Sequence, residues 1–357
     1  MITLSLCMIV KNESDVIARC LTCIKDIADE IIVVDTGSTD DTKEIVSRFT
    51  DKVYDYQWHD DFAAARNFSF SKATMQYTMW LDADDVIDEE NQQLLLRLKE
   101  NLSPSIDMVL MRYDVAFDES GRPTMSYYRE RIMRTSMKYQ WIGEIHEVIF
   151  QTGNLEQREI FIKHQKLHPT ETGRNLRIFQ KMIADGKTLD QRQRYYYARE
   201  LMYNGDYVAA TRELDSYLAD DLGWIENKIG ACKDLANCLQ WQKQPHKALD
   251  ALLKSFSYDA PRAEICCDIG SHFIDQQSFQ TAIFWYALAV QRPLNEENGA
   301  FCLRDCYDYI PYMQLCVCYD RIGDHKTAMY YNEKAAAIKP DDQGVLFNRQ
   351  YFSKLDL

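Results

Sequence analysis

Short apolar runs alternate with amphipathic stretches through residues 1–110, and this alternation constrains the fold of the chain most strongly. Four runs have the composition of buried strands: "ITLSLCMIV", "EIIVVD", "KVYDYQW" and "YTMWLDAD". The segments that follow the first two, "NESDVIARCLTCIKDI" and "STDDTKEIVSRF", have the apolar spacing of helices. Strands that alternate with helices predict βαβ units and a mostly parallel sheet.

The pattern changes after residue 105. Three longer runs indicate antiparallel strands: "IDMVLMRYDVAF", "SYYRERIMRT" and "YQWIGEIHEVIF". The residues "ESGRP" supply a turn between the first two of these strands. From about residue 190 the strand patterns end and only helical patterns remain. The sequence therefore predicts an α/β domain followed by an all-α domain, with residues 1–175 in the first and 176–357 in the second.

The helical part repeats itself. Small residues open the second helix of successive helix pairs at Ala210, Ala248, Ala282 and Ala328, which are 38, 34 and 46 residues apart. The phrase "GDYVAA" recurs as "GDHKTA", and a step near 34 residues is typical of tetratricopeptide-type repeats. An insertion around "LNEENGAFCLRDC" accounts for the longest interval. A generic helical bundle is the alternative.

Charge and composition exclude some classes of function. The chain of 357 residues has a formal net charge of −14, which argues against broad nucleic-acid binding and against attraction to an anionic membrane surface. Its 11 cysteines show no repeated metal-binding spacing, so we interpret them as buried apolar residues in a reducing cytoplasm. No stretch approaches the roughly 18 apolar residues that a membrane span needs, and the N-terminal run indicates a strand rather than a signal peptide.

Acidic residues follow two of the predicted strands. Asp35 ends "EIIVVD", and Asp82, Asp84 and Asp85 end "YTMWLDADDV". Ligands bind beyond the carboxyl ends of strands in open α/β sheets, so we expect these carboxylates to border one crevice. Crowded carboxylates suit Mg²⁺ or Mn²⁺, which in turn can bridge a diphosphate. The alternative is that these acids only favour the N-termini of the helices that follow.

Two further motifs contain groups suited to catalysis. Arg66 in "DDFAAARNFSF" can balance phosphate charge, although a surface ion pair with a neighbouring aspartate is an alternative. Glu144, His146 and Glu147 cluster in "WIGEIHEVI", where a His–Glu pair can act as a general base. On a strand, Glu144 and His146 share one face and Glu147 points to the other.

Taken in order, "SLCMIVKNESDVIARCLTCI", "IIVVDTGSTDDT", "DDFAAARN", "WLDADD" and "HE" resemble a family 2 glycosyltransferase of the GT-A fold. The resemblance covers roughly residues 1–170. With the helical repeats, it looks most like the branch of bacterial S-glycosyltransferases that act on bacteriocin peptides, and lipopolysaccharide-core transferases share several of the motifs. It implies a GT-A domain at 1–175 and a tetratricopeptide-like domain at 176–357.

The resemblance also implies an activity and a set of roles. The family moves a sugar from a nucleotide-diphosphate donor, usually a UDP-sugar, with inversion at the anomeric carbon and with Mn²⁺ or Mg²⁺. Carried over, the residues that bind the donor nucleotide begin with Val10, Lys11, Asn12 and Glu13, which line its pocket. Asp35 binds the nucleobase, Arg66 faces the phosphates, and Asp82 with Ala83 lies by the ribose and diphosphate. Asp84 and His164 are the implied metal ligands.

The catalytic base departs from the family pattern. Many members use an aspartate in an "ED" motif, whereas this chain has "EIHE". We therefore assign the base to Glu147 or His146, with Glu144 as a further candidate.

The acceptor is less constrained than the donor. Repeat arrays present long concave surfaces, so we expect a peptide or protein acceptor, and self-association into a homodimer through the repeats is a further expectation. Alternatives are a saccharide or lipid-linked glycan, a modified (hydroxymethylated) nucleic-acid base, and an inactive transferase domain that serves as a binding scaffold. The aromatic run Tyr195–Tyr197 either contacts the acceptor or packs between helices.

Overall fold

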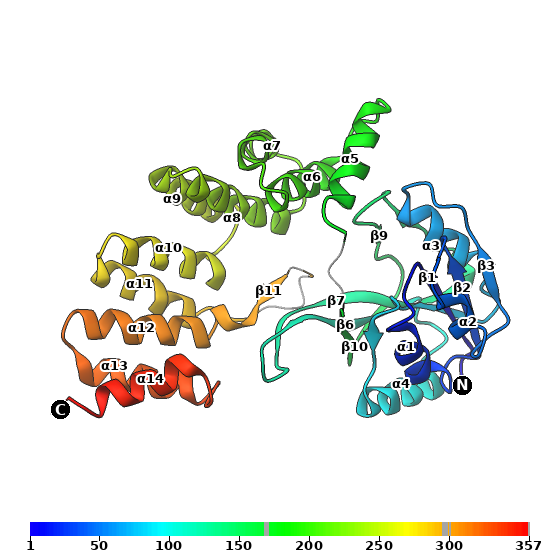
Figure 1. Ribbon diagram of the computed structural model, residues 1–357, viewed down its shortest axis with the longest axis horizontal. Coiled ribbons are helices and arrows are strands. Elements are labelled where there is room, and N and C mark those ends of the chain that lie inside the picture. The colour runs from blue at the N-terminus through cyan, green and yellow to red at the C-terminus, as the bar shows by residue number, and fades with distance from the viewer. Residues whose placement is uncertain (168–170, 295–298, 300, 356–357) are drawn as a thin grey trace. The chain divides into compact units, whose positions relative to one another are not determined.

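A computed structural model describes residues 1–167, 171–294, 299 and 301–355, and its chain divides into two compact units. The first unit is Met1–Lys187 together with the short segment that ends at Phe301. The second unit contains the helices that follow Thr188 (Figure 1). The predicted α/β domain followed by an all-α domain is confirmed.

The first unit is built on one mixed sheet whose strands follow the order β3-β2-β1-β4-β7-β6-β10-β5. These strands are β1 (Leu4–Val10), β2 (Glu30–Asp35), β3 (Val53–Asp55), β4 (Tyr77–Trp80), β5 (Asp85–Val86), β6 (Met108–Phe117), β7 (Pro123–Arg134) and β10 (Leu155–His164). Strands β1 to β4 are parallel, as predicted, while β7 runs antiparallel to both β4 and β6. Strand β10, which the sequence analysis missed, pairs with β6 and with β5.

Helices α1 (Ile17–Ile24), α2 (Thr42–Val46), α3 (Phe62–Phe70) and α4 (Glu89–Asn101) pack around this sheet. The first unit also contains α5 (Arg174–Ala184) and a 3₁₀ turn at Thr135–Met137. Alternate residues of β1 point to opposite faces. Leu6 and Met8 join the core that contains Leu21 of α1, whereas the Cys7 thiol contacts the Ser69 carbonyl of α3 at 3.5 Å. Strand β1 is therefore buried on both sides, which explains its nearly continuous apolar sequence.

Helix α5 belongs to the first unit. Phe179 is fully buried there and its ring stacks on His146 with centroids 6.1 Å apart. Lys181 forms an ion pair with Asp60 at 2.7 Å. The boundary expected from the sequence falls inside this helix, and the structure groups residues 176–187 with the first unit because α5 packs its apolar face there.

The expected strand "YQWIGEIHEVIF" was wrong in its middle part. The chain forms two short antiparallel strands, β8 (Trp141–Ile142) and β9 (Val148–Ile149), joined by a tight turn. Gly143 and His146 both take positive φ values, +99° and +52°, which a continuous strand does not contain. Glu144 and His146 therefore do not lie on a strand.

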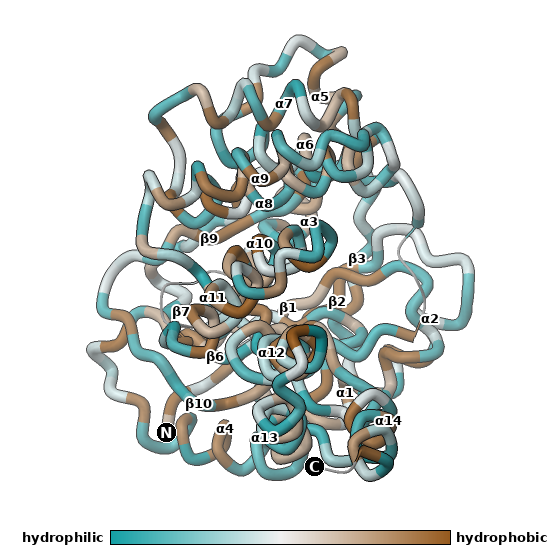
Figure 2. The backbone as a smooth tube through the Cα atoms, turned by 90° about the vertical axis from the view of Figure 1, so that its left-hand side faces the viewer, coloured by the Kyte–Doolittle hydropathy of each residue, from teal (hydrophilic) through white to brown (hydrophobic). Residues whose placement is uncertain are grey.

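The second unit stacks helix pairs, as the repeat pattern predicted. Its elements are α6 (Gln191–Tyr203), α7 (Tyr207–Ala219), α8 (Ile225–Trp241), α9 (Pro245–Lys254), α10 (Ala263–Asp275), α11 (Phe279–Val290), α12 (Tyr309–Arg321), α13 (His325–Ala336) and α14 (Gln343–Phe352), with short elements at Ser255–Ser257, Cys302–Leu303 and Arg304–Cys306. Hydrophobic and hydrophilic residues alternate along these helices (Figure 2). The middle of the expected insertion, residues 295–298 and 300, lies outside the described residues.

The small residues that revealed the repeat sit where helices meet. Ala210, Ala248, Ala282 and Ala328 are each 0% exposed. Tyr195 and Tyr196 are also buried, so these two rings pack between helices. All 11 cysteines are buried and free, which agrees with their expected role as apolar core residues. Among the described residues, the structure contains no helix with the length and apolarity of a membrane span.

Candidate active site

Strand register brings the two acidic strand ends to one edge of the sheet. Asp35 on β2 is paired with Val10 on β1, and Trp80 on β4 is paired with Cys7 on the other side of β1. Counting on from the Trp80–Cys7 pair, Asp82 is level with Ile9, the residue before Val10. Two spacings between neighbouring strands, roughly 10 Å, separate the β2 and β4 ends. The carboxyl ends of strands are where ligands bind in open α/β sheets.

The loops after β1 and β2 are tied together above this edge. Asn12 has a φ of +54°, its N–H donates to Ser38 Oγ at 2.9 Å, and its Oδ1 accepts from Thr39 N–H at 2.7 Å. Asp35, 2% exposed, accepts from Ser38 N–H at 2.9 Å. Asp35 thus organises the loop rather than capping α2, while Lys11 beside it is exposed.

Glu13 reaches the same region from the β1 loop. Its N–H donates to Thr42 Oγ1 at 2.8 Å. Burial raises the pKa of Glu13 to about 7, and the negative charges of Asp84, Asp82 and Asp40 contribute to that rise. Carboxylates from two different strand ends therefore repel one another here.

Asp85 anchors the acidic motif and is fully buried. Its Oδ2 accepts from Arg131 Nη1 at 3.1 Å and from the Asp82 N–H at 3.0 Å. Its Oδ1 accepts from the Tyr113 hydroxyl at 2.8 Å. Arg131 is itself 0% exposed and stacks on the Trp80 ring at 3.7 Å. The charge of Asp85 is consequently balanced by protein groups. The neighbouring Asp82 and Asp84 are therefore better placed to bind a ligand.

His164 joins this motif because β10 pairs with β5 in the register that sets His164 opposite Asp85. Its Nδ1 lies 3.1 Å from Asp84 Oδ1 and 3.3 Å from Asp85 Oδ1. Burial alone would lower the pKa of His164, but the hydrogen bonds and charges of Asp84 and Asp85 raise it to about 10.

These side chains form a candidate Asp–Asp–His metal site. Ligand atoms of Asp82, Asp85 and His164 lie within 4.8 Å of one another, and Asp84 adds a carboxylate at hydrogen-bond distance from His164. The carboxylate oxygens of this group suit Mg²⁺ or Mn²⁺. Asp84, the ligand that the resemblance implied, is not in this group of three, and Asp85 already accepts from several protein donors.

Arg66 connects this site to the second motif. Its Nη2 donates to Asp82 Oδ1 at 2.8 Å and its Nε donates to Glu147 Oε1 at 2.6 Å. The guanidinium lies 5.2 Å from the Trp80 ring and 4.8 Å from the Trp141 ring, and the residue is 9% exposed. The ion pairs of Arg66 are thus internal to the site, unlike the surface pair with a neighbouring aspartate weighed from the sequence.

The three base candidates have different surroundings. Glu147 has a 12% exposed side chain and is held by Arg66. His146 stacks on Phe179 of α5, and Glu144 forms an ion pair with Lys187. Through Arg66, Glu147 is connected to Asp82 of the acidic motif.

Sequence reasoning missed Tyr113 and Arg131, which hold Asp85. Both lie in predicted strands, on β6 and β7, and both are buried. A charged residue such as Arg131 inside a run with strand character was the available signal, because a buried charge needs a partner.

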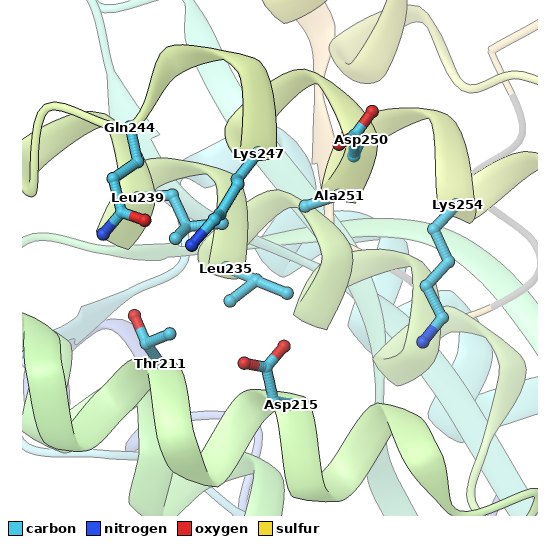
Figure 3. A pocket seen from close by; sticks show the side chains of 9 residues that line it. All are labelled: Thr211, Asp215, Leu235, Leu239, Gln244, Lys247, Asp250, Ala251 and Lys254. Atoms are coloured by element: carbon cyan, nitrogen blue, oxygen red, sulfur yellow. The ribbon is translucent and has the colours of Figure 1, made fainter.

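The second unit contains a separate groove between α7, α8 and α9 (Figure 3). It is lined by Thr211, Asp215, Leu235, Leu239, Gln244, Lys247, Asp250, Ala251 and Lys254. The ammonium groups of Lys247 and Lys254 and the carboxylate of Asp215 point into the groove, while the Asp250 carboxylate points away. An apolar floor with charged walls suits an amphipathic partner.

Comparisons with known proteins match the two parts of the chain to different kinds of protein. The sequence model of Glycosyl transferase family 2 matches residues 5–164. The TPR repeat-containing protein Synpcc7942_0270 of Synechococcus elongatus is 28% identical over 297 residues, which are 83% of this chain and 68% of that protein. Glycosyltransferase SunS of Bacillus phage SPbeta is 36% identical over 148 residues, which are 41% of this chain and 34% of that protein. The chain thus spans about two thirds of the first relative and a third of the second.

A third relative matches over a similar region. The lipopolysaccharide core biosynthesis glycosyltransferase LpsC of Rhizobium meliloti is 27% identical over 168 residues, 43% of this chain and 58% of that protein. Among solved structures, MamA covers 43% of this chain and 82% of its own chain at 23% identity, with a TM-score of 0.35. The TPR protein YrrB covers 50% and 84% at 16% identity, with a TM-score of 0.37.

Proposed function

We propose that this chain, whose residues 5–164 form a family 2 glycosyltransferase domain, transfers a sugar from a nucleotide-diphosphate donor with inversion at the anomeric carbon. One observation carries the proposal. Arg66 joins Asp82 of the acidic motif to Glu147 of the second motif, at 2.8 and 2.6 Å. Carboxylates suited to a cation-bound diphosphate and a carboxylate suited to accept a proton therefore lie on either side of one guanidinium.

The donor occupies the crevice at the carboxyl ends of β1, β2 and β4 in this proposal. Its nucleoside, most simply uridine, contacts the loop from Val10 to Glu13 and Asp35, while Asp82 and Ala83 lie by the ribose and diphosphate. Asp84 and His164 would hold Mn²⁺ or Mg²⁺, and the ion would neutralise charge on the leaving diphosphate. Arg66 orients Asp82 through their ion pair. In this proposal that role takes the place of the direct contact with the phosphates that the resemblance implied.

Glu147 is the proposed base. In a single displacement the bond from the anomeric carbon to the diphosphate oxygen breaks, and a bond from that carbon to the acceptor oxygen or sulfur forms. The acceptor's proton passes to Glu147, and the nucleoside diphosphate leaves. Arg66 holds one oxygen of Glu147 and so fixes the direction of the carboxylate. Glu144 and His146 are instead engaged by Lys187 and Phe179.

We propose a peptide or protein as the acceptor and the cytoplasm as the compartment. A relative matching 83% of the chain is named for its TPR repeats, and repeat arrays offer extended surfaces for partners. The groove of Figure 3 is the contact that we assign to the acceptor, with Lys247 and Lys254 on its wall. The 11 buried free cysteines suit a reducing compartment.

Incubation with UDP-sugars and Mn²⁺, followed by measurement of released UDP, tests the donor half of the proposal. Asp84→Asn should lose both UDP release and the rise in melting temperature that UDP and Mn²⁺ cause together. Glu147→Gln should keep that rise but lose turnover by about 10² to 10⁴-fold, the usual contribution of a general base. Asp55→Asn is the matched control, because Asp55 is an exposed acid of the same unit. A folded wild type without shift or release from any donor would instead support the scaffold alternative.

Mass spectrometry of candidate acceptors tests the second half. The double variant Lys247→Glu/Lys254→Glu should raise KM for a peptide acceptor and leave donor hydrolysis unchanged. Modification of a saccharide or of a hydroxymethylated nucleic-acid base, with no dependence on these lysines, would refute the peptide assignment.

A further inference from the structure

Tyr113 lies at the centre of the acidic site, although nothing in the motifs marks it. It sits on β6, opposite Ile162 of the neighbouring strand β10. His164 follows two residues later on β10 and so points to the same face of the sheet. Tyr113 is 5% exposed.

The Tyr113 ring is fixed on several sides. It meets the Trp80 ring edge-on with centroids 6.5 Å apart and the Tyr127 ring edge-on at 5.9 Å. The Arg131 guanidinium stacks over it at 4.2 Å. A ring held this way gives its hydroxyl one position, since rotation about the ring axis does not move the oxygen.

The hydroxyl has three neighbours in the site: Asp82 Oδ2 lies 3.5 Å away, and two other groups are closer. It lies 2.8 Å from Asp85 Oδ1 and 2.8 Å from His164 Nδ1. The hydroxyl has one proton, and an ionised carboxylate only accepts, so the O–H donates to Asp85. The Tyr113 oxygen then accepts from the Nδ1–H of His164.

The other neighbours of His164 Nδ1 require the same proton position. Asp84 Oδ1 at 3.1 Å and Asp85 Oδ1 at 3.3 Å are both acceptors. In the neutral imidazole the lone pair is then on Nε2, which is the nitrogen able to bind a cation. Partners of this kind around a ligating histidine set its tautomer and orientation.

We propose that Tyr113 is a positioning residue for the cation site: its hydroxyl orders Asp85 and the Nδ1 edge of His164, so that the imidazole keeps its Nε2 lone pair for a cation. This inference rests on the proposed metal site. It assigns a function to a buried hydroxyl that the transfer reaction itself does not use. Loss of the hydroxyl should weaken binding of the cation while leaving the packing of the Tyr113 ring intact.

Titration of the full chain with Mn²⁺, followed by electron paramagnetic resonance of the free ion, tests this role without relying on activity. Tyr113→Phe should raise the Kd for Mn²⁺ by roughly 10- to 100-fold, the usual effect of removing a partner of a ligating residue. Tyr77→Phe is the matched control, because Tyr77 is a buried tyrosine of the same sheet whose hydroxyl donates to the Ile106 carbonyl at 2.8 Å. Its Kd should stay within about twofold of the wild type, since its hydroxyl contacts none of the candidate ligands.

The outcomes separate this inference from the proposed function. If the wild type binds Mn²⁺ and folded Tyr113→Phe binds it equally well, the positioning role is refuted and the metal site stands. If the wild type binds no Mn²⁺ with or without UDP, both are refuted. Should Tyr113→Phe fold poorly, Tyr113→Met, which also lacks the hydroxyl but fills the space with a flexible apolar chain, must show the same rise in Kd.

Discussion

Removal of the Arg66 guanidinium is the most direct test of how the site is held together. The substitution Arg66→Met keeps an unbranched side chain of similar reach and deletes the charge. It leaves Asp82 and Glu147, with side chains 29% and 12% exposed, without the cation that now bridges them. Removing one partner of a buried ion pair typically destabilises by about 3–5 kcal/mol. Because Asp82 is partly exposed, we expect about 3 kcal/mol.

The loss of unfolding free energy in Arg66→Met should be larger at high pH than at low pH. Burial by itself would raise the pKa of Asp82, but Arg66, followed by Arg131 and His164, holds it below its usual range. In the wild type, Asp82 therefore contributes stability above about pH 4 that is lost as the pH falls below it. In Arg66→Met, Asp82 loses its closest cation, so the cost of its negative charge grows as the pH rises. The difference between the two proteins should be largest near pH 8 and shrink toward pH 5.

Urea unfolding followed by tryptophan fluorescence measures this difference. Trp80 and Trp141 lie about 5 Å from the Arg66 guanidinium and report on the region directly. Arg48→Met makes the same chemical change in an exposed pair with Glu44 and should cost less than about 0.5 kcal/mol. Adding Glu147→Gln to Arg66→Met should recover part of the loss. A cost below about 1 kcal/mol, or one that is equal at pH 5 and pH 8, would refute this account of Arg66.

Two other substitutions test the framework around the site. Buried Glu30 accepts from Ser5, from Lys52 at 2.5 Å and from Thr74 at 2.9 Å. Although burial alone would raise its pKa, these hydrogen bonds lower it to about 2. Glu30→Gln should therefore cost about 1–3 kcal/mol at pH 7. This difference from the wild type should disappear between about pH 4 and pH 2 in acid-unfolding curves, and persistence at the lower pH would contradict it. Gly270→Ala should destabilise the repeat unit by about 1–3 kcal/mol despite the better helix propensity of alanine. The reason is that its Cβ would lie 2.7 Å from the Tyr286 ring. Unfolding curves with exposed Ser271→Ala as the control check this, and a gain in stability would overturn it.

The sequence predicted the architecture because the two parts of the chain have different periods. β-branched runs alternating with helices imply a parallel sheet, and a recurring small residue implies stacked helix pairs. The carboxyl-end rule then brought Asp35 and Asp82 to one edge without any knowledge of distances. The register of β1 with β2 and β4 agrees with that expectation.

Long-range pairing was beyond the reach of local patterns. Strand β10 is half exposed and rich in charged residues, so its sequence resembles a surface segment, yet it delivers His164 to Asp85. The turn at Gly143 and His146 interrupts an apparent strand because two residues adopt positive φ, which composition does not reveal. The Arg66 pairs with Asp82 and Glu147 join residues 16 and 81 positions apart, so only the fold could identify them.

The balance of charge explains why this edge of the sheet suits a dication better than a single lysine or arginine. Asp85 is paired with Arg131, and Asp84 is paired with His164. Asp82 and Glu147 both form ion pairs with Arg66, and Glu13 adds a further carboxylate whose pKa is raised by its burial and by the neighbouring aspartates. A buried carboxylate excess of this kind is costly unless a ligand offsets it. A divalent cation provides two charges at one point, and it can do so only while its ligands are ordered, which is the task that falls to Tyr113 and Arg66.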